Sequence, residues 1–256
     1  MNEIEINQEE EKRIEIKDNF KRAKTLLTVF WVLTGLTLVG LLAGYNKLQI
    51  LKNAQIGEYV SEEEANLSDL LQGIIGLIQL GLYIASVVVF LNWFRRAYGN
   101  LHRAGITYIE HKESMAVWTW FIPIIWFYRP VQIMNEIWTE TQEKIKKLNS
   151  TYEMKSGGLI IGLWWSLFII SNFIGRYVLK SAFKQDTIEQ LIESSEATLI
   201  SDIMQIPEAL LVILIVHKLS KMESKLAHEV KKSGGNFIYF SLPKKSAQPF
   251  HSSYLF

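Results

Sequence analysis

The chain has 256 residues, of which 49% are hydrophobic and 12% aromatic, and its 27 basic and 26 acidic side chains leave a net charge of +1. It contains no cysteine, which excludes disulfides and thiolate chemistry. The basic residues follow the ends of long apolar segments and form no single basic stripe, so nucleic-acid binding is not indicated.

Two long uncharged segments occupy the first part of the chain. Residues 25–45 form an apolar run of 21 residues, and residues 70–94 form one of 25. At 1.5 Å per residue, an α-helix of either length crosses about 30 Å of hydrocarbon. The first run is too long for a signal-peptide core, so we expect it to be an uncleaved transmembrane helix.

The connection over residues 95–156 contains a short aromatic stretch. Residues 115–128 are apolar but only 14 in number, are interrupted by Pro123 and have basic residues on both flanks. A helix this short does not span a bilayer, and a proline inside it breaks the regular hydrogen bonding. We therefore expect a re-entrant or interfacial segment on the cytoplasmic side.

The residues after Pro130 predict an amphipathic helix. Its apolar side chains recur at helical spacing, at Val131, Met134, Trp138, Ile145 and Leu148. Such a face suits either the bilayer or a soluble partner, and the adjacent aromatic stretch favours the bilayer. The sequence thus predicts an interfacial hairpin over residues 115–148.

Two further spanning helices are expected, over about residues 157–179 and 197–219. The first contains an uncharged run of 19 residues that ends at Arg176, and the second carries Pro207 and Glu208 within its apolar part. The predicted fold is an all-α integral membrane protein with four transmembrane helices arranged as two hairpins. A membrane domain over residues 25–225 would lie between a charged segment, 1–24, and a cytoplasmic tail, 226–256.

The distribution of Lys and Arg predicts the topology. Residues 1–24 carry six of them, 95–156 carry nine and 217–256 carry seven, whereas 46–69 and 180–202 carry two each. Basic residues near helix ends remain in the cytoplasm, so the first three segments, both termini included, are expected there.

All eight tryptophans fall in the half that this topology assigns to the cytoplasm, at positions 31, 93, 118, 120, 126, 138, 164 and 165. Indole rings prefer the headgroup region of a bilayer. An asymmetric aromatic belt is therefore a simpler explanation than a ligand-binding aromatic cage.

Several strips of sequence occur in a distinctive order. Phe90-Leu-Asn-Trp-Phe-Arg-Arg96 is followed by Trp118-Thr-Trp-Phe-Ile-Pro123, by Arg129-Pro130 before the amphipathic helix, and by Trp164-Trp165. This combination resembles the bacterial membrane family called domain of unknown function 4328, over about residues 25–225. The resemblance implies a multi-pass protein of the bacterial plasma membrane and implies no reaction, because the family has no established activity.

Two groups of side chains are candidates for function. The first would bind anionic lipid headgroups or a protein partner, with topogenic charge as the simpler explanation for its arginines, and comprises Arg95, Arg96, Arg103, Trp118, Trp120, Trp126, Arg129 and Trp138. The second comprises ionisable residues of the membrane helices, Glu208 and Arg176. Glu208 would bind a cation or relay a proton, although a structural pair with Arg129 or another buried donor is the simpler expectation. Arg176 and Asp202 are expected at the external interface.

No catalytic or metal-binding pattern occurs in the sequence, and the five histidines lack metal-ligand spacing. We therefore expect no enzymatic activity and no cofactor. The favoured hypothesis is a non-catalytic scaffold or sensor that binds membrane lipids or a protein partner through its cytoplasmic aromatic hairpin, as a single chain or a homo-oligomer. The alternative is a transporter or channel component for a small solute or ion, with Glu208 in the membrane.

Overall fold

The computed structural model describes residues 16–109, 111–183 and 186–233, and every regular element in these ranges is a helix. The all-α class expected from the sequence is thereby confirmed. In chain order the elements are α1 (Phe20–Gln55), α2 (Glu62–Arg103), α3 (Met115–Trp118), the 3₁₀ helix η1 (Ile125–Phe127), α4 (Arg129–Leu148), α5 (Gly158–Ser181) and α6 (Ile188–Lys232).

Four of these helices, α1, α2, α5 and α6, are long and apolar enough to cross a membrane, as the sequence predicts. Three of them are much longer than their apolar runs: α1, α2 and α6 contain 36, 42 and 45 residues. At 1.5 Å per residue they measure about 54, 63 and 68 Å, roughly twice the thickness of a hydrocarbon core. These helices therefore extend well beyond a bilayer, whereas α5, with 24 residues, is close to spanning length.

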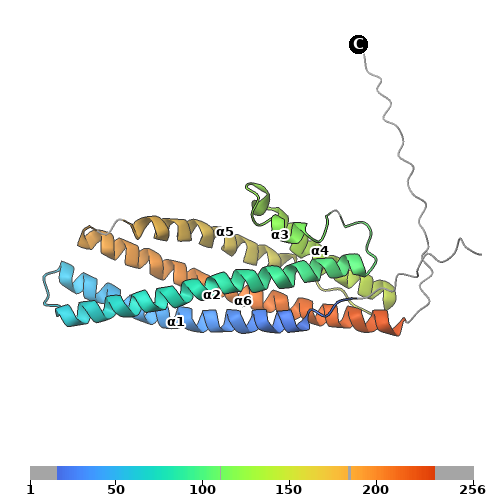
Figure 1. Cartoon of the computed structure of the whole chain (residues 1–256), viewed down its shortest axis with the longest axis horizontal. Coiled ribbons are helices and arrows are strands. Elements are labelled where there is room, and N and C mark those ends of the chain that lie inside the picture. The colour runs from blue at the N-terminus through green and yellow to red at the C-terminus, as the bar shows by residue number, and fades with distance from the viewer. Residues whose placement is uncertain (1–15, 110, 184–185, 234–256) are drawn as a thin grey trace, which may run out of the picture.

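The helices α1 and α6 form the centre of the bundle. α1 packs against both α2 and α6, and α6 also packs against α5 and α4. The four long helices run along the longest axis of the molecule, and α4 lies near the end where α2 and α6 finish (Figure 1). We call this the α4 end, and the opposite end, where α1 joins α2 and α5 joins α6, the turn end.

Local sequence explains where several helices begin. The hydroxyl of Ser61 accepts a 3.2 Å hydrogen bond from the amide of Glu64 at the start of α2. Thr187 caps α6 in the same way. Pro130 lies in the first turn of α4, where a missing N–H breaks no helical bond.

The core is densest at the α4 end. There α2 contributes Trp93, Phe94 and Tyr98, which are completely shielded, and α4 and α6 add Ile137 and Leu219. Large aromatic side chains bury 150 Å² or more each, so burial of this cluster is a main source of stability. The most rigid packing of the protein is therefore expected where α2, α4 and α6 meet.

The apolar face of α4 packs against the protein itself. Met134, Trp138 and Ile145 are buried, and α4 contacts α2, α5 and α6. The expectation that this face meets the bilayer is therefore wrong. The physical reason is that α2 and α6 continue past spanning length and offer a protein surface to the same apolar stripe.

The first part of the predicted tail, up to Lys232, continues α6 as regular helix. The remainder, residues 234–256, lies outside the described residues.

Candidate functional site

Four arginines gather near the α4 end, namely Arg22 of α1 and Arg95, Arg96 and Arg103 of α2, and we call them the arginine cluster. Glu113, just before α3, partly neutralises it: one carboxylate oxygen lies 3.3 Å from Nε of Arg95 and the other 2.8 Å from an Nη of Arg103. These ion pairs tie the base of the aromatic stretch to α2.

Arg96 is attracted by the carboxylates of Glu113 and of Glu223 in α6 but forms an ion pair with neither. It is half-buried, and among the described residues it makes no hydrogen bond or ion pair. Arg22, Arg103 and Arg95 are its cationic neighbours, and Arg22 donates to the backbone carbonyl of Asn92 at 3.3 Å. Guanidinium groups held close together attract oxyanions such as phosphate, whose oxygens can accept two parallel N–H hydrogen bonds.

Residues 115–128, which we call the aromatic segment, are anchored by Trp120. Its ring lies 5.4–6.5 Å, centroid to centroid, from five aromatic rings of α2 and α5: Phe90, Phe94, Trp164, Trp165 and Phe168. The indole of Trp165 also donates a 3.0 Å hydrogen bond to the carbonyl of Phe127. The aromatic segment thus joins two helices that are distant in the sequence.

The other side of the aromatic segment is exposed. Trp118, Phe121 and Ile124 have 60%, 62% and 77% of their surface accessible. Ile124 has a φ of 71°, a left-handed conformation that is strained for a β-branched residue. Trp126 is half-buried, and its ring lies 4.2 Å from the Phe127 ring at a tilt of 40° and 6.5 Å from the Phe168 ring of α5.

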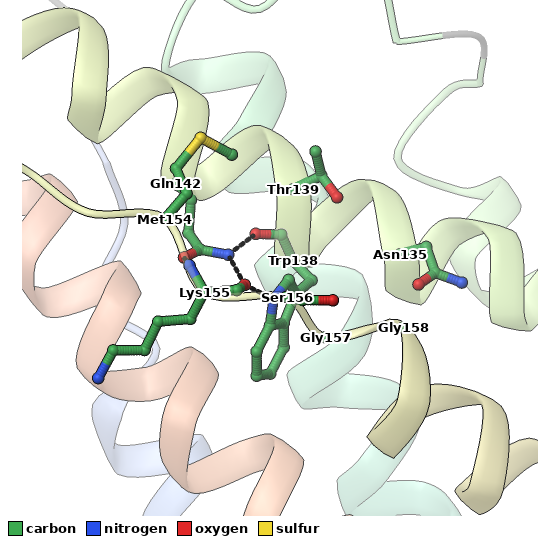
Figure 2. A pocket seen from close by; sticks show the side chains of 9 residues that line it. All are labelled: Asn135, Trp138, Thr139, Gln142, Met154, Lys155, Ser156, Gly157 and Gly158. Atoms are coloured by element: carbon green, nitrogen blue, oxygen red, sulfur yellow. Dashed lines mark hydrogen bonds between the residues drawn. The ribbon is translucent and has the colours of Figure 1, made fainter.

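Trp138 holds the loop that precedes α5. Its Nε1 donates a 2.7 Å hydrogen bond to the carbonyl of Lys155, and the side chain of Gln142 pairs with both backbone groups of Lys155, at 2.9 and 2.7 Å (Figure 2). A Cβ at Gly157 would lie 2.4 Å from the indole. Trp138 is only 3% exposed and its indole N–H is bonded to Lys155, so in this structure it holds the loop in place.

An open pocket of about 330 Å³ lies beside this clamp. Figure 2 shows its lining, which is made of Asn135, Trp138, Thr139, Gln142, Met154, Lys155, Ser156, Gly157 and Gly158. The amide of Gln142 and the indole of Trp138 are already engaged by backbone groups. The indole N–H of Trp138 and the side-chain amide of Gln142, which could otherwise bind a ligand in the pocket, are therefore occupied by the backbone of Lys155.

The tryptophans do not form the expected belt. Trp93, Trp138 and Trp164 are buried in the core, and Trp120 packs among the rings described above. Only Trp31 and Trp118 are largely exposed. The one-sided distribution therefore reflects mainly an internal aromatic cluster at the α4 end.

The two ionisable candidates of the membrane helices lie apart from the arginine cluster. Glu208 of α6 is half-buried near Ser171 of α5 and Tyr83 of α2, and Arg176 is exposed on α5. The guanidinium of Arg129 lies 5.4 Å from the centre of the Tyr128 ring. The sequence offered Arg129 or another buried donor as the partner of Glu208, and the hydroxyl of Ser171 is such a donor beside the carboxylate.

A buried polar cluster at the α4 end was not predicted. The carboxylate of Glu223 in α6 accepts hydrogen bonds from Asn100 of α2 and Asn19 at the start of α1, both at 3.0 Å. Asn100 also pairs with both backbone groups of Lys17, at 3.1 and 2.9 Å. A signal was present, because a glutamate at position 223 interrupts the apolar face of α6 between Leu219 and Leu226.

The side chains of the described residues include no group of three or more His, Cys, Asp or Glu that could hold a metal ion. Their most distinctive chemistry is cationic and aromatic, at the α4 end. Taken with the four apolar helices, these features define a helical multi-pass membrane protein.

Residues 57–221 match the protein family described as domain of unknown function (DUF4328), and the chain belongs to this family. The resemblance seen in the sequence is thereby confirmed. No curated protein and no solved structure matches the chain.

Proposed function

We propose that this protein is a non-catalytic scaffold or sensor of the bacterial plasma membrane that binds anionic lipid headgroups at its α4 end, with both termini in the cytoplasm. The observation that carries the proposal is the half-buried guanidinium of Arg96, which lies among three other arginines and forms no hydrogen bond or ion pair with the described residues. Anionic lipids of the cytoplasmic leaflet attract basic residues next to membrane helices by about 1 kcal/mol each.

The contacts of the aromatic segment support its entry into the bilayer. Trp120 and Phe127 contact Trp165 and Phe168, which lie about 10 and 15 Å along α5 from its first residue at 1.5 Å per residue. The exposed face of the segment is apolar and aromatic, as suits lipid contact. The segment would thus re-enter the membrane beside the headgroups that the arginines bind.

Ion pairing supports a specific site over a diffuse basic surface. Glu113 occupies Arg95 and Arg103, whereas Arg22 and Arg96 keep donors available for an added phosphate. Bidentate arginine–phosphate contacts are stronger than contacts of exposed lysines.

Lipid retention tests the proposal. The protein is placed in nanodiscs that contain phosphatidylglycerol and phosphatidylcholine, released into the gas phase, and its bound lipids are counted by native mass spectrometry. We expect Arg22→Gln combined with Arg96→Gln to lower phosphatidylglycerol retention several-fold. Arg176→Gln, an exposed arginine on α5, is the matched control and should retain it. Equal retention by all three proteins would reject the lipid site and favour a protein partner at this surface.

Single-cysteine labelling tests the orientation, since the chain has no cysteine of its own. The variants are Asn53→Cys, His111→Cys, Asn149→Cys, Glu193→Cys and Ser246→Cys, treated on intact cells with a membrane-impermeant maleimide. Labelling of the cysteines at 53 and 193 alone is expected. Labelling at 149 would show that the aromatic segment spans the bilayer.

A transporter or channel component is the second candidate, because Glu208 lies half-buried in a membrane helix without an ion pair among the described residues. Its test is cation and proton flux through proteoliposomes. Loss of a flux in Glu208→Gln, but not in the exposed control Glu153→Gln, would support this function. Unchanged flux in Glu208→Gln would exclude the residue from any pathway.

A further inference from the structure

Asp202 is a carboxylate in the interior of the helix bundle. Only 7% of its surface is exposed, whereas an interfacial position was expected from the sequence. Among the residues that the structure describes, its side chain makes no hydrogen bond and no ion pair. A charged group in this situation costs several kcal/mol of solvation free energy unless something compensates it.

Because Gly40 has no side chain, two polar groups, the amide of Gln79 and the carboxylate of Asp202, can lie beside its backbone. A Cβ at Gly40 of α1 would lie 2.9 Å from Nε2 of Gln79 in α2 and 3.6 Å from Oδ2 of Asp202 in α6. The third neighbour of this position is a methyl group of Ile75, at 3.4 Å. Three helices therefore converge here, and glycine leaves the amide and the carboxylate facing the same small space.

Gln79 supplies an independent sign that this space receives a ligand. Its Nε2 is buried and, within the part of the chain that the structure describes, has no hydrogen-bond partner. Buried donors without partners are uncommon in proteins and call for an explanation. The buried N–H group of Gln79 and the carboxylate of Asp202 each lack a hydrogen-bond partner among the described residues, and both lie beside Gly40.

The position lies inside the membrane part of the bundle. Ion pairs of 2.8 Å between Lys52 and Glu196 and between Lys47 and Asp69 mark the turn end. Asp202 is about 9 Å further into the bundle than Glu196 at 1.5 Å per residue. The apolar run of α6 begins directly after it.

No ion pair with a described residue compensates Asp202. The titratable groups of α5, which packs against α6, are Arg176, Tyr177 and Lys180; Arg176 is exposed and Tyr177 donates a hydrogen bond to Glu193. On α1 there is no titratable side chain between Lys24 and Tyr45. On α2 the nearest titratable groups in sequence are Asp69 and Tyr83, and on α6 they are Glu196 and Glu208. The carboxylate thus depends on Gln79 and on whatever binds between them.

We propose that Asp202, together with Gln79 and Gly40, forms a proton-binding site within the membrane. The chemistry selects a proton because Ca²⁺ and Mg²⁺ require about six oxygen ligands, and this space offers one carboxylate and one amide beside a methyl group. In the neutral state the acid donates its O–H to the amide oxygen of Gln79. In the ionised state the rotated side-chain amide of Gln79 donates an N–H to the carboxylate of Asp202. The hydrogen bond between α2 and α6 therefore changes direction when the proton binds or leaves.

Infrared difference spectroscopy of the reconstituted full chain tests the site. A pH titration should show the carbonyl band of a protonated carboxyl group in apolar surroundings. We expect this band to be lost in Asp202→Asn, which conserves the shape of the side chain, and retained in Glu208→Gln. A band that persists unchanged in Asp202→Asn would overturn the proposal.

Variants around Asp202 keep the test decisive if the asparagine variant does not fold. Gln79→Leu removes the donor that stabilises the ionised acid, so the midpoint of the band should move towards alkaline pH by about one unit. Gly40→Ala should also move the midpoint because its methyl group displaces Gln79, whereas Gly35→Ala, whose Cβ would meet nothing within 4 Å, should not. Midpoints that are identical in Gln79→Leu, Gly40→Ala and the wild type would reject the assignment.

Discussion

The side-chain amide of Asn100 donates a 3.0 Å hydrogen bond to the carboxylate of Glu223, although 123 positions separate the two residues. This bond connects the end of α2 to the end of α6. Because Asn100 also pairs with the backbone of Lys17, it attaches the chain that enters α1 to the same point. One buried amide thus secures three of the four long helices at the α4 end.

Replacing Asn100 with alanine should destabilise the protein. Asn100→Ala removes the shorter of two hydrogen bonds to Oε1 of Glu223 and leaves the N–H and C=O of Lys17 without their side-chain partner, and each unsatisfied buried group costs about 1–3 kcal/mol. Thermal unfolding in detergent should show a lower midpoint. Asn92→Ala is the matched control on the same helix, since the side chain of Asn92 is exposed and donates only to the carbonyl of Val88 in its own helix. Equal midpoints for the two variants would contradict this role.

Removing the ring of Trp120 should loosen the aromatic segment. Trp120→Ala leaves a cavity among five rings, and large-to-small substitutions of this kind cost about 3–5 kcal/mol. Limited proteolysis should then cleave within residues 115–128 faster than in the wild type. Trp118→Ala serves as the control because its side chain is 60% exposed. The packing interpretation fails if both variants are cleaved at the wild-type rate.

A methyl group at position 157 should displace the loop that Trp138 holds. Gly157→Ala places a Cβ 2.4 Å from the indole, and overpacking of this kind costs about 1–3 kcal/mol. Hydrogen exchange of the Lys155 amide, which bonds to Gln142, should become faster. At the next residue, Gly158→Ala meets open space and should leave this exchange unchanged. Unaltered exchange in Gly157→Ala would show that the loop is not clamped.

Tyr108, in the loop after α2, should titrate at unusually alkaline pH. Burial raises the pKa of its phenol, and a hydrogen bond to Glu140 raises the pKa further. The folded protein therefore holds this proton more tightly than the unfolded chain, and the stabilisation, present at neutral pH, is lost as pH rises through the folded-state pKa. Because the side chain is more than half exposed, the effect on stability is small.

Ultraviolet absorbance at alkaline pH measures this titration. The difference between the wild type and Tyr108→Phe isolates one tyrosine among ten. In a Glu140→Gln background the same difference should appear at lower pH, whereas Glu153→Gln, at an exposed glutamate, should not move it. A midpoint that does not respond to Glu140→Gln would mean that the hydrogen bond is not formed in solution.

Several features of this protein follow from local sequence alone. The four spanning helices were predictable because an uncharged run of about 20 residues is sufficient to cross a bilayer, whatever its neighbours are. The family was recognisable because its strips of sequence occur in a fixed order. The helix ends were less predictable, since α6 continues through Pro207 and far past its apolar run.

The candidate site was predicted only in part. The sequence drew attention to Arg96 and Trp120, because basic and aromatic residues stand out beside apolar helices. It assigned Trp138 and the rest of the apolar face of α4 to the bilayer, and the structure places them in the core. A helical apolar stripe has the same spacing whether lipid or protein covers it, so the pattern cannot distinguish the two environments.

The polar groups inside the bundle depended on tertiary contacts. Asn19 and Glu223 are 204 positions apart in the sequence. Gln79 and Asp202 come close to the same point only because both lie beside Gly40 of α1. Whether a buried carboxylate has a partner is a property of the helices that pack around it, and no local pattern encodes that arrangement. Composition and periodicity were therefore sufficient for the membrane helices, while the hydrogen-bond partners of Glu223 and the burial of Asp202 emerged from the packing of α1, α2 and α6.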